Sequence, residues 1–533
     1  MEKRLLLAFL LSFFVLSIWT KLFPPSKSAP ANNTQVVAEE ELATNTGEKA
    51  AAPPLPALAR ETSVPPDEKI LVIENNALRV ELSNVGATVK RIVIKEHNVS
   101  LPVTEMFAVS GFDDAAFSVI DHGSDFVRFV AARNGLEISK KFTLWQDNLL
   151  RTKIEIVNQS SGERQEDLDI LGFKLDISRM DKDMGHDRDR SLLEYSISAD
   201  NKAFRKGDAY KFSEKSYKKQ QGGVDWEGFR SKYFCMITIP QFKTTGYEIK
   251  PRGEKALYIY NSLENIKIGV LDKVVFDFVT FSGPQKLSLL KSHGMGFDQI
   301  MKFSNFGLLD SIAKGIYIAM HWMHKVIPNW GVCILLISVL IYGALYPLTI
   351  KGMSSMKKMQ ALQPKMAALR EQYKTNPQKL NKEVMELYKE HKINPLGGCL
   401  PLLLQMPIFI GLYQVLWRSV DFKGAKFLWI KDLSLPDRLF TLPVEIPFIG
   451  SDFNILPILM VVIMVWQQKI SAKNTVITDP AQASQQKMMM TIFPVFIGFI
   501  FYKLASGLCL YFTVFYVLST FTQWKMSKMT KVL

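Results

Sequence analysis

The chain has 533 residues, a formal net charge of +14 and 48% hydrophobic residues. Its apolar residues gather in residues 5–22 and again after residue 329, which excludes an ordinary soluble protein throughout. Much of the excess positive charge flanks these apolar runs, so we expect a phospholipid membrane as the partner and no DNA. The four cysteines form no Cys-x-x-Cys or Cys/His cluster, so we expect no metal site and no cofactor.

Residues 1–23 are predicted to be an uncleaved membrane anchor. Lys3 and Arg4 precede the uncharged run Leu5–Trp19, and these cations favour a cytoplasmic N-terminus. A cleaved signal peptide is the alternative, but a good cleavage site does not follow the run. Residues 24–67 are rich in Pro, Ala, Thr, Asn and Glu without a hydrophobic period, which predicts a disordered linker.

Residues 68–300 are predicted to form an all-β sandwich outside the membrane. Short apolar or alternating runs are separated by Asn, Gly, Asp and Ser, as is typical of strands and turns. Its acidic residues show no recognisable metal or catalytic spacing. The predicted strands include Ile70–Ile73, Leu78–Leu82, Val89–Ile94, Phe126–Ala131, Leu136–Leu144, Leu150–Ile156, Phe234–Ile239, Ala256–Tyr260 and Val274–Phe281.

Residues 301–328 are predicted to form an amphipathic helix along the outer membrane–water boundary. Asp310 is expected to lie off its apolar face. His321 and His324 are three residues apart but have no third ligand nearby, so we expect surface histidines rather than a metal site. The predicted apolar face consists of Leu308, Ile312, Ile316, Met320 and Met323.

Apolar segments long enough to span a bilayer follow, and with the anchor they predict six transmembrane helices. Lys and Arg outnumber acidic residues in 351–395, 471–487 and 525–533, but not in 419–452. The positive-inside rule therefore makes the first three cytoplasmic and the last one periplasmic, with both termini in the cytoplasm. The predicted spans are 329–350, 396–418, 453–470, 488–504 and 505–524.

The cytoplasmic segment 351–395 has a helical apolar period that Thr375–Pro377 interrupts, which predicts an antiparallel helical hairpin. Its methionines either form an adaptable peptide-binding face or pack the seam of the hairpin. Its basic surface suits ribosomal RNA or anionic lipid headgroups. The candidate contact residues are Met356, Lys357, Lys358, Met359 and Lys365.

The segment Asn394–Phe409 is apolar but carries three prolines, two glycines and Gln405, so neighbouring helices or water must help to satisfy its backbone. With five other motifs it makes the chain similar to the YidC/Oxa/Alb family of membrane protein insertases, in the Gram-negative YidC type. The motifs are Asn329–Gly331, Tyr346–Thr349, Leu362–Lys365, Asn394–Cys399, Gln405–Phe409, Thr478–Pro480 and Ser506–Leu508.

The resemblance implies a polytopic α-helical protein of the inner membrane, with five helices forming the insertase core, plus a large periplasmic β-supersandwich domain. It implies a hydrophilic groove, open to the cytoplasm and to lipid, through which nascent membrane proteins enter the bilayer without catalysis. The implied partners are nascent membrane proteins, the ribosome and the Sec translocon (SecYEG and accessory Sec subunits).

We predict that the groove is lined by polar and aromatic side chains of the core helices. The family usually has an arginine where this chain has Tyr342, and often a second tyrosine where it has Phe512. Lys503 either supplies the missing cation or extends to the headgroups. For the polar residues, helix–helix hydrogen bonding is the alternative role. The groove candidates are Ser338, Tyr342, Gln405, Lys503, Tyr511 and Phe512.

Two other functions compete with this one. A transporter or channel predicts paired intramembrane charges or inverted repeats, whereas the apolar runs contain a lone lysine and no visible repeat. A membrane-anchored sugar-modifying enzyme would use the β domain, and the sequence leaves that possibility open.

Overall fold

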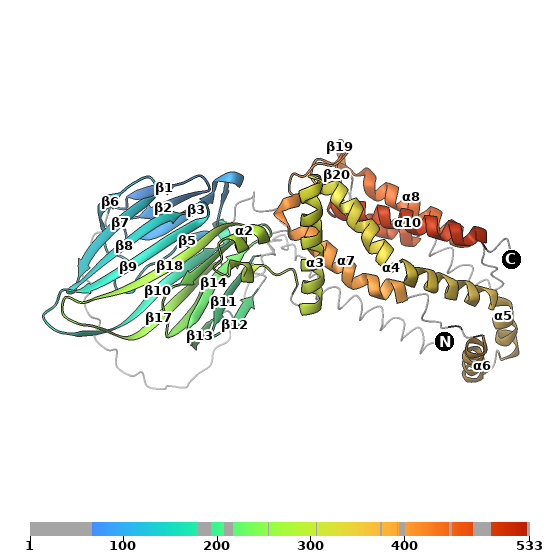
Figure 1. Ribbon diagram of the computed structural model, residues 1–533, viewed down its shortest axis with the longest axis horizontal. Helices are drawn as coiled ribbons and strands as arrows, with labels where there is room; N and C mark the ends of the chain where they lie inside the picture. The colour runs from blue at the N-terminus through green and yellow to red at the C-terminus, as the bar shows by residue number, and fades with distance from the viewer. Residues whose placement is uncertain are drawn as a thin grey trace, which may run out of the picture. The chain divides into compact units, whose positions relative to one another are not determined.

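The computed structural model describes residues 67–179, 193–206, 217–253, 255–304, 306–373, 376–391, 393, 400–446, 450–472 and 492–529. Its contacts divide the chain into a β unit (Met1–Ser231 and Met236–Ser282) and a helical unit (Lys232–Cys235 and Gly283–Leu533; Figure 1). The predicted anchor, residues 24–66 of the linker, and the motifs Asn394–Cys399 and Thr478–Pro480 lie outside the described residues.

Within the described residues, the strands of the β unit form three sheets (Figure 1). The four-stranded sheet has the order β1 (Ile70–Glu74), β2 (Leu78–Ser83), β3 (Thr88–Ile94) and β4 (Val99–Ser100). The five-stranded sheet has the order β13 (Lys218–Gln221), β16 (Gly246–Arg252), β17 (Ala256–Ile268), β10 (Arg164–Asp176) and β5 (Val103–Glu105). The nine-stranded sheet has the order β12 (Lys202–Lys206), β11 (Glu194–Ala199), β14 (Val224–Arg230), β15 (Phe234–Pro240), β18 (Lys273–Pro284), β9 (Leu149–Asn158), β8 (Leu136–Trp145), β7 (Phe126–Arg133) and β6 (Ser118–His122).

Every strand predicted above from alternation lies within one of these strands, so that part of the prediction is confirmed. The strand β9, which pairs with β8 and β18, shows why alternation was a reliable signal. Its residues Ile154 and Ile156 are buried on one side, whereas Arg151 on the other side is exposed. The five-stranded and nine-stranded sheets pack against each other. The rings of Phe173 on β10 and Phe229 on β14 lie 5.9 Å apart between their centroids.

The core between these sheets contains a fully buried carboxyl group. Glu227 on β14 is fully buried and accepts a hydrogen bond from Asn261 Nδ2 at 2.9 Å. Gly172 makes room for it, since a Cβ there would lie 1.7 Å from Glu227 Oε1. Glu227 Oε2 and Asn261 Oδ1 have no hydrogen-bond partner among the described residues. Burial raises the pKa of Glu227 to about 8, so the site favours the protonated acid, which supplies the donor that this pair of oxygens lacks.

The helical unit begins earlier than the predicted boundary at residue 300. Residues from Gly283 onward group with it, and the backbone N–H of Leu287 donates to the Tyr317 hydroxyl at 3.3 Å. Its helices are α2 (Leu287–Ser292), α3 (Gly307–Val326), α4 (Trp330–Ala361), α5 (Gln363–Gln372), α6 (Pro377–Glu390), α7 (Leu400–Arg418), α8 (Ile455–Ala472), the helix Ile492–Phe501 and α10 (Ser506–Met529). A hairpin of β19 (Phe440–Ile446) and β20 (Gly450–Phe453) precedes α8.

The helix α4 differs from the prediction at its C-terminal end. It continues past residue 350 to Ala361, and the helical period predicted to continue up to Thr375 is interrupted at Leu362. Pro364 explains the break, because it lacks an N–H donor and its ring clashes with the carbonyl four residues earlier. Beyond the break, α5 and α6 pair in antiparallel fashion. Tyr388 donates to Met366 Sδ at 3.3 Å, so this methionine packs the seam.

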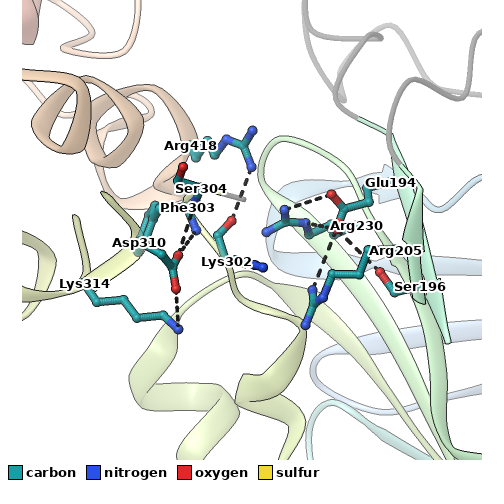
Figure 2. A network of polar contacts seen from close by, with 10 residues as sticks. All are labelled: Glu194, Ser196, Arg205, Arg230, Lys302, Phe303, Ser304, Asp310, Lys314 and Arg418. Atoms are coloured by element: carbon teal, nitrogen blue, oxygen red, sulfur yellow. Dashed lines mark hydrogen bonds and ion pairs between the residues drawn. The ribbon is translucent and has the colours of Figure 1, made fainter. Parts of the chain in front are cut away.

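The helix α3 corrects the prediction for Asp310, which is buried rather than directed away from the packed face. Its carboxylate accepts the backbone N–H groups of Phe303 and Ser304 at 2.7 and 3.3 Å and pairs with Lys314 at 3.0 Å (Figure 2). A buried carboxylate is tolerated here because these donors compensate its lost hydration. Leu308, in contrast, was expected on the apolar face but is 71% exposed.

Candidate functional site

Two side-chain hydrogen bonds join α10 to α4 and α8 at nearly one level. The Tyr342 hydroxyl on α4 donates to Thr522 Oγ1 at 2.7 Å, and Gln467 Nε2 on α8 donates to Ser519 Oγ at 2.7 Å. Ser519 and Thr522 are three residues apart, which is about 4.5 Å along a helix axis. A layer of uncharged polar groups therefore lies between helices that are otherwise apolar.

The prediction from sequence missed three of these four residues: Ser519, Thr522 and Gln467. The signal was present, because polar residues occur at 519, 520, 522 and 523 in an otherwise apolar helix. The prediction chose its candidates on α10 around Tyr511 and did not follow the polar residues toward the C-terminal end of that helix. Gln523 belongs to the same layer, and its Oε1 is buried without a partner among the described residues.

The predicted residues Ser338 and Tyr342 lie one turn apart on α4, and both are buried. Ser338 Oγ donates to the Ile334 carbonyl at 2.5 Å, within its own helix. The Tyr342 ring packs on Phe515 of α10 at 5.5 Å between centroids. The Tyr342 hydroxyl thus makes the helix–helix hydrogen bond that the alternative interpretation assigns to it.

The predicted residues Gln405, Tyr511 and Phe512 form a second group. Tyr511 is fully buried, its hydroxyl has no partner within hydrogen-bond distance among the described residues, and Gln405 of α7 is the polar side chain that faces it. The Phe512 ring lies 5.0 Å from that of Phe409. Along α10 this group is about 16 Å from Thr522 at the helical rise per residue. The candidates therefore occupy two levels rather than one cluster.

Lys503 belongs to neither group. It lies in the turn between the helix Ile492–Phe501 and α10, and its side chain is exposed. This position favours the second of the two predicted roles, in which the Lys503 side chain extends to the lipid headgroups, over a cation inside the groove.

Among the predicted hairpin contacts, Lys357 has a defined role on α4. Its ammonium group donates to the Met526 carbonyl at 2.6 Å, near the C-terminal end of α10, where a cation is favourable. The other predicted contacts are exposed or half-buried: Met356, Lys358, Met359 and Lys365.

The loop after α7, residues 419–446 and 450–454 of the described chain, closes one end of this helical arrangement. The Leu435 carbonyl accepts the Ser506 N–H at 2.7 Å at the start of α10. Asp437 Oδ2 accepts the Leu456 N–H at 2.8 Å at the start of α8. The loop thus satisfies backbone donors that helix N-termini otherwise leave unpaired.

The same loop contacts the first turn of α4. A Cβ at Gly331 would lie 2.1 Å from Cγ of Phe427, so the ring packs directly on the glycine backbone. The N-terminal ends of α4, α8 and α10 therefore all contact this loop.

His321 and His324, predicted to be surface histidines, are half-buried and have defined partners. His321 Nε2 lies 3.1 Å from Asp421 Oδ2, and Ser419 Oγ donates to the same oxygen at 2.7 Å. Burial alone would raise the pKa of Asp421, but the hydrogen bonds from His321 and Ser419 hold it below its usual value. His324 stacks on Trp330 at 3.9 Å between ring centroids. These contacts join α3 to α4 and to the loop after α7.

Apolar side chains on several helices face outward. Within the described residues one helix, Trp330–Met359, is long and apolar enough to span a membrane, and Ile455–Ile470 and Ile492–Phe501 are shorter apolar helices. Continuous exposed apolar faces are rare on soluble proteins. The exposed side chains include Leu336, Val339 and Leu340 on α4, Ile458, Leu459, Val462 and Trp466 on α8, and Ile492, Phe493, Val495, Phe496 and Phe499 on the following helix.

Comparison with known proteins identifies the family. Residues 322–532 match the family model of the 60Kd inner membrane protein, and residues 114–319 match that of the YidC periplasmic domain. A membrane protein insertase YidC of Pelodictyon phaeoclathratiforme is 32% identical over 505 residues, covering 87% of this chain and 83% of that protein. The chain belongs to the YidC family of membrane protein insertases.

Another YidC insertase, from Chlorobaculum tepidum, is 29% identical over 566 residues and covers 98% of this chain and 94% of that protein. A solved structure titled as an active YidC insertase with the first transmembrane domain resolved is 20% identical. It covers 86% of this chain and 92% of that chain with a TM-score of 0.38. The two family models and the relative at 32% identity confirm the resemblance stated from the motifs, and the β unit coincides with much of the YidC periplasmic domain match.

Proposed function

We propose that this YidC-family insertase moves nascent membrane proteins into the bilayer through a hydrophilic groove beside the polar layer of α10. The observation that carries the proposal is the polar layer of α10, where Gln467 of α8 reaches Ser519 and the buried Gln523 Oε1 has no partner among the described residues. This layer offers uncharged donors and acceptors between apolar helices.

The physical gain is a lower barrier for the polar part of the client. An unpaired peptide group in hydrocarbon costs several kcal/mol. Hydroxyl and amide side chains such as Ser519, Thr522 and Gln523 can exchange hydrogen bonds with a passing backbone. Because these side chains are uncharged, they would not hold the client backbone tightly. No covalent bond is formed or broken in this process.

We further propose six transmembrane helices, five of them forming the core, with both termini in the cytoplasm. The positive-inside distribution of Lys and Arg supports this orientation. In this arrangement the helix ends held by the loop after α7 face the periplasm, and the exposed lysines of α5 and α6 face the ribosome or the headgroups. The protein works alone or with the Sec translocon.

In this topology α3 lies along the outer membrane surface. One face packs on the helical unit through Ile316, Met320 and Met323. The opposite face exposes Ile318 and Trp322, at 54% and 67%, as an interfacial helix requires.

The test places photo-reactive residues at Gln467 and Thr522 and challenges the membranes with a ribosome-stalled nascent membrane protein. Matched positions are Val462 on α8 and Val339 on α4, which are 59% and 48% exposed and face outward. We expect client adducts at 467 and 522 from short nascent chains, before adducts appear at the outward positions. Normal insertion without adducts at 467 and 522 would contradict the groove.

A further inference from the structure

The loop after α7 carries a tight turn whose tip is apolar and exposed. Phe427 and Ile430 exchange backbone hydrogen bonds at 2.9 and 2.8 Å, which leaves Leu428 and Trp429 as the two residues of the turn. Leu428 is 74% exposed and Trp429 is 37% exposed. Leu428 has φ 50°, a left-handed conformation that glycine or asparagine adopts with less strain.

This turn is held firmly against the helix ends. The Phe427 ring packs on Gly331 in the first turn of α4, and Ile430 is only 1% exposed. The Trp429 indole N–H donates to Asp437 Oδ2 at 3.2 Å, the oxygen that also receives the N–H of Leu456. The exposed tip therefore lies beside the first turn of the apolar helix α4, at the end of its hydrophobic length.

The flanking residues indicate what the tip meets. Lys426 and Lys431 stand one residue outside the turn on either side, and both are exposed. A leucine at the apex, a tryptophan with its N–H already paired, and two flanking cations match the layers of a bilayer surface. Apolar groups suit the acyl region, indole the interface and ammonium groups the phosphates.

We propose that the turn Phe427–Ile430, with Lys426 and Lys431, is a membrane anchor that inserts Leu428 and Trp429 into a leaflet containing anionic phospholipid. It fixes the loop that holds the N-terminal ends of α4, α8 and α10. The inference is continuous with the outward apolar face of α4 and rests on the membrane placement of the helical unit under the proposed function.

A left-handed backbone at an exposed leucine does not by itself identify a membrane anchor. A second exposed leucine in the chain with the same backbone conformation serves as the control. Leu271 in the β17–β18 turn is also left-handed, with φ 59°, and is 76% exposed, but it lies in the β unit. A third position, Val462 on α8, reports whether the helical unit itself is in lipid.

The test uses the full chain in liposomes of phosphatidylethanolamine and phosphatidylglycerol, with an environment-sensitive NBD label on Leu428→Cys, Leu271→Cys or Val462→Cys. The unsubstituted chain measures background labelling. We expect a blue-shifted emission and quenching by doxyl-labelled lipids at 428 and 462, and neither at 271. The double change Lys426→Glu with Lys431→Glu should weaken quenching at 428 in anionic liposomes more than in phosphatidylcholine.

Each other outcome overturns the proposal. Quenching at 462 without quenching at 428 refutes the anchor and leaves the membrane placement intact. A blue-shifted label at 428 that doxyl lipids do not quench indicates burial against protein, in the same chain or in a second copy, and refutes the anchor. Absence of quenching at both positions refutes the membrane placement as well.

Discussion

The close contact between Gly331 and Phe427 can be tested by comparing alanine substitutions at two glycines of α4. In Gly331→Ala the new Cβ would lie 2.1 Å from Phe427 Cγ and 2.5 Å from its Cβ, so the aromatic side chain must move. Overpacking of this kind costs about 1–3 kcal/mol. A Cβ at Gly343, also on α4, would meet no atom of another segment within 4 Å. Gly343→Ala should therefore stabilise by roughly 0.5–1 kcal/mol, the usual gain of alanine over glycine inside a helix.

The assay is thermal unfolding of both variants in the same detergent. We expect opposite shifts of the melting temperature relative to the parent chain, corresponding to a difference of roughly 1.5–4 kcal/mol between the two variants. The destabilisation by Gly331→Ala should shrink when Phe427→Ala removes the ring, since the two residues are in contact. Equal melting temperatures for Gly331→Ala and Gly343→Ala would refute the packing argument.

Three further predictions concern the polar groups and the β unit. Tyr342→Phe should weaken the α4–α10 contact by about 0.6–1.7 kcal/mol, and a double-mutant cycle with Thr522→Val should show coupling in melting experiments. Glu227→Gln should make stability of the β unit less dependent on pH. The folded pKa of about 8 exceeds the ordinary 4.5, so the stabilisation is complete below pH 4.5 and is lost as pH rises to about 8. The loss should be at most on the order of 5 kcal/mol, and urea unfolding at several pH values measures it. Deletion of residues 68–282, which stops before the helical unit resumes at Gly283, should leave insertion of a reporter membrane protein largely intact, whereas an enzyme located in the β unit would lose its activity.

The sequence predicted elements whose signal is local. Alternation identified strands such as β8 and β9, because one side of each strand faces the core and the other does not. Uninterrupted apolar runs identified α4 and α8, because a helix that can span a bilayer needs about twenty consecutive apolar residues. The break after Ala361 was missed although Pro364 is visible in the sequence, because the apolar period on either side of it continued.

The sequence alone determined the family, the division into a β part and a helical part, and the helices rich in apolar residues, since composition and short motifs carry this information along the chain. Only the tertiary structure decided how polar side chains are used. Tyr342 gives its hydroxyl to Thr522, Asp310 is buried under backbone donors, and His321 pairs with Asp421. Each of these depends on a partner supplied by another segment, and the direction of a side chain toward a distant residue is set by packing rather than by its neighbours in sequence.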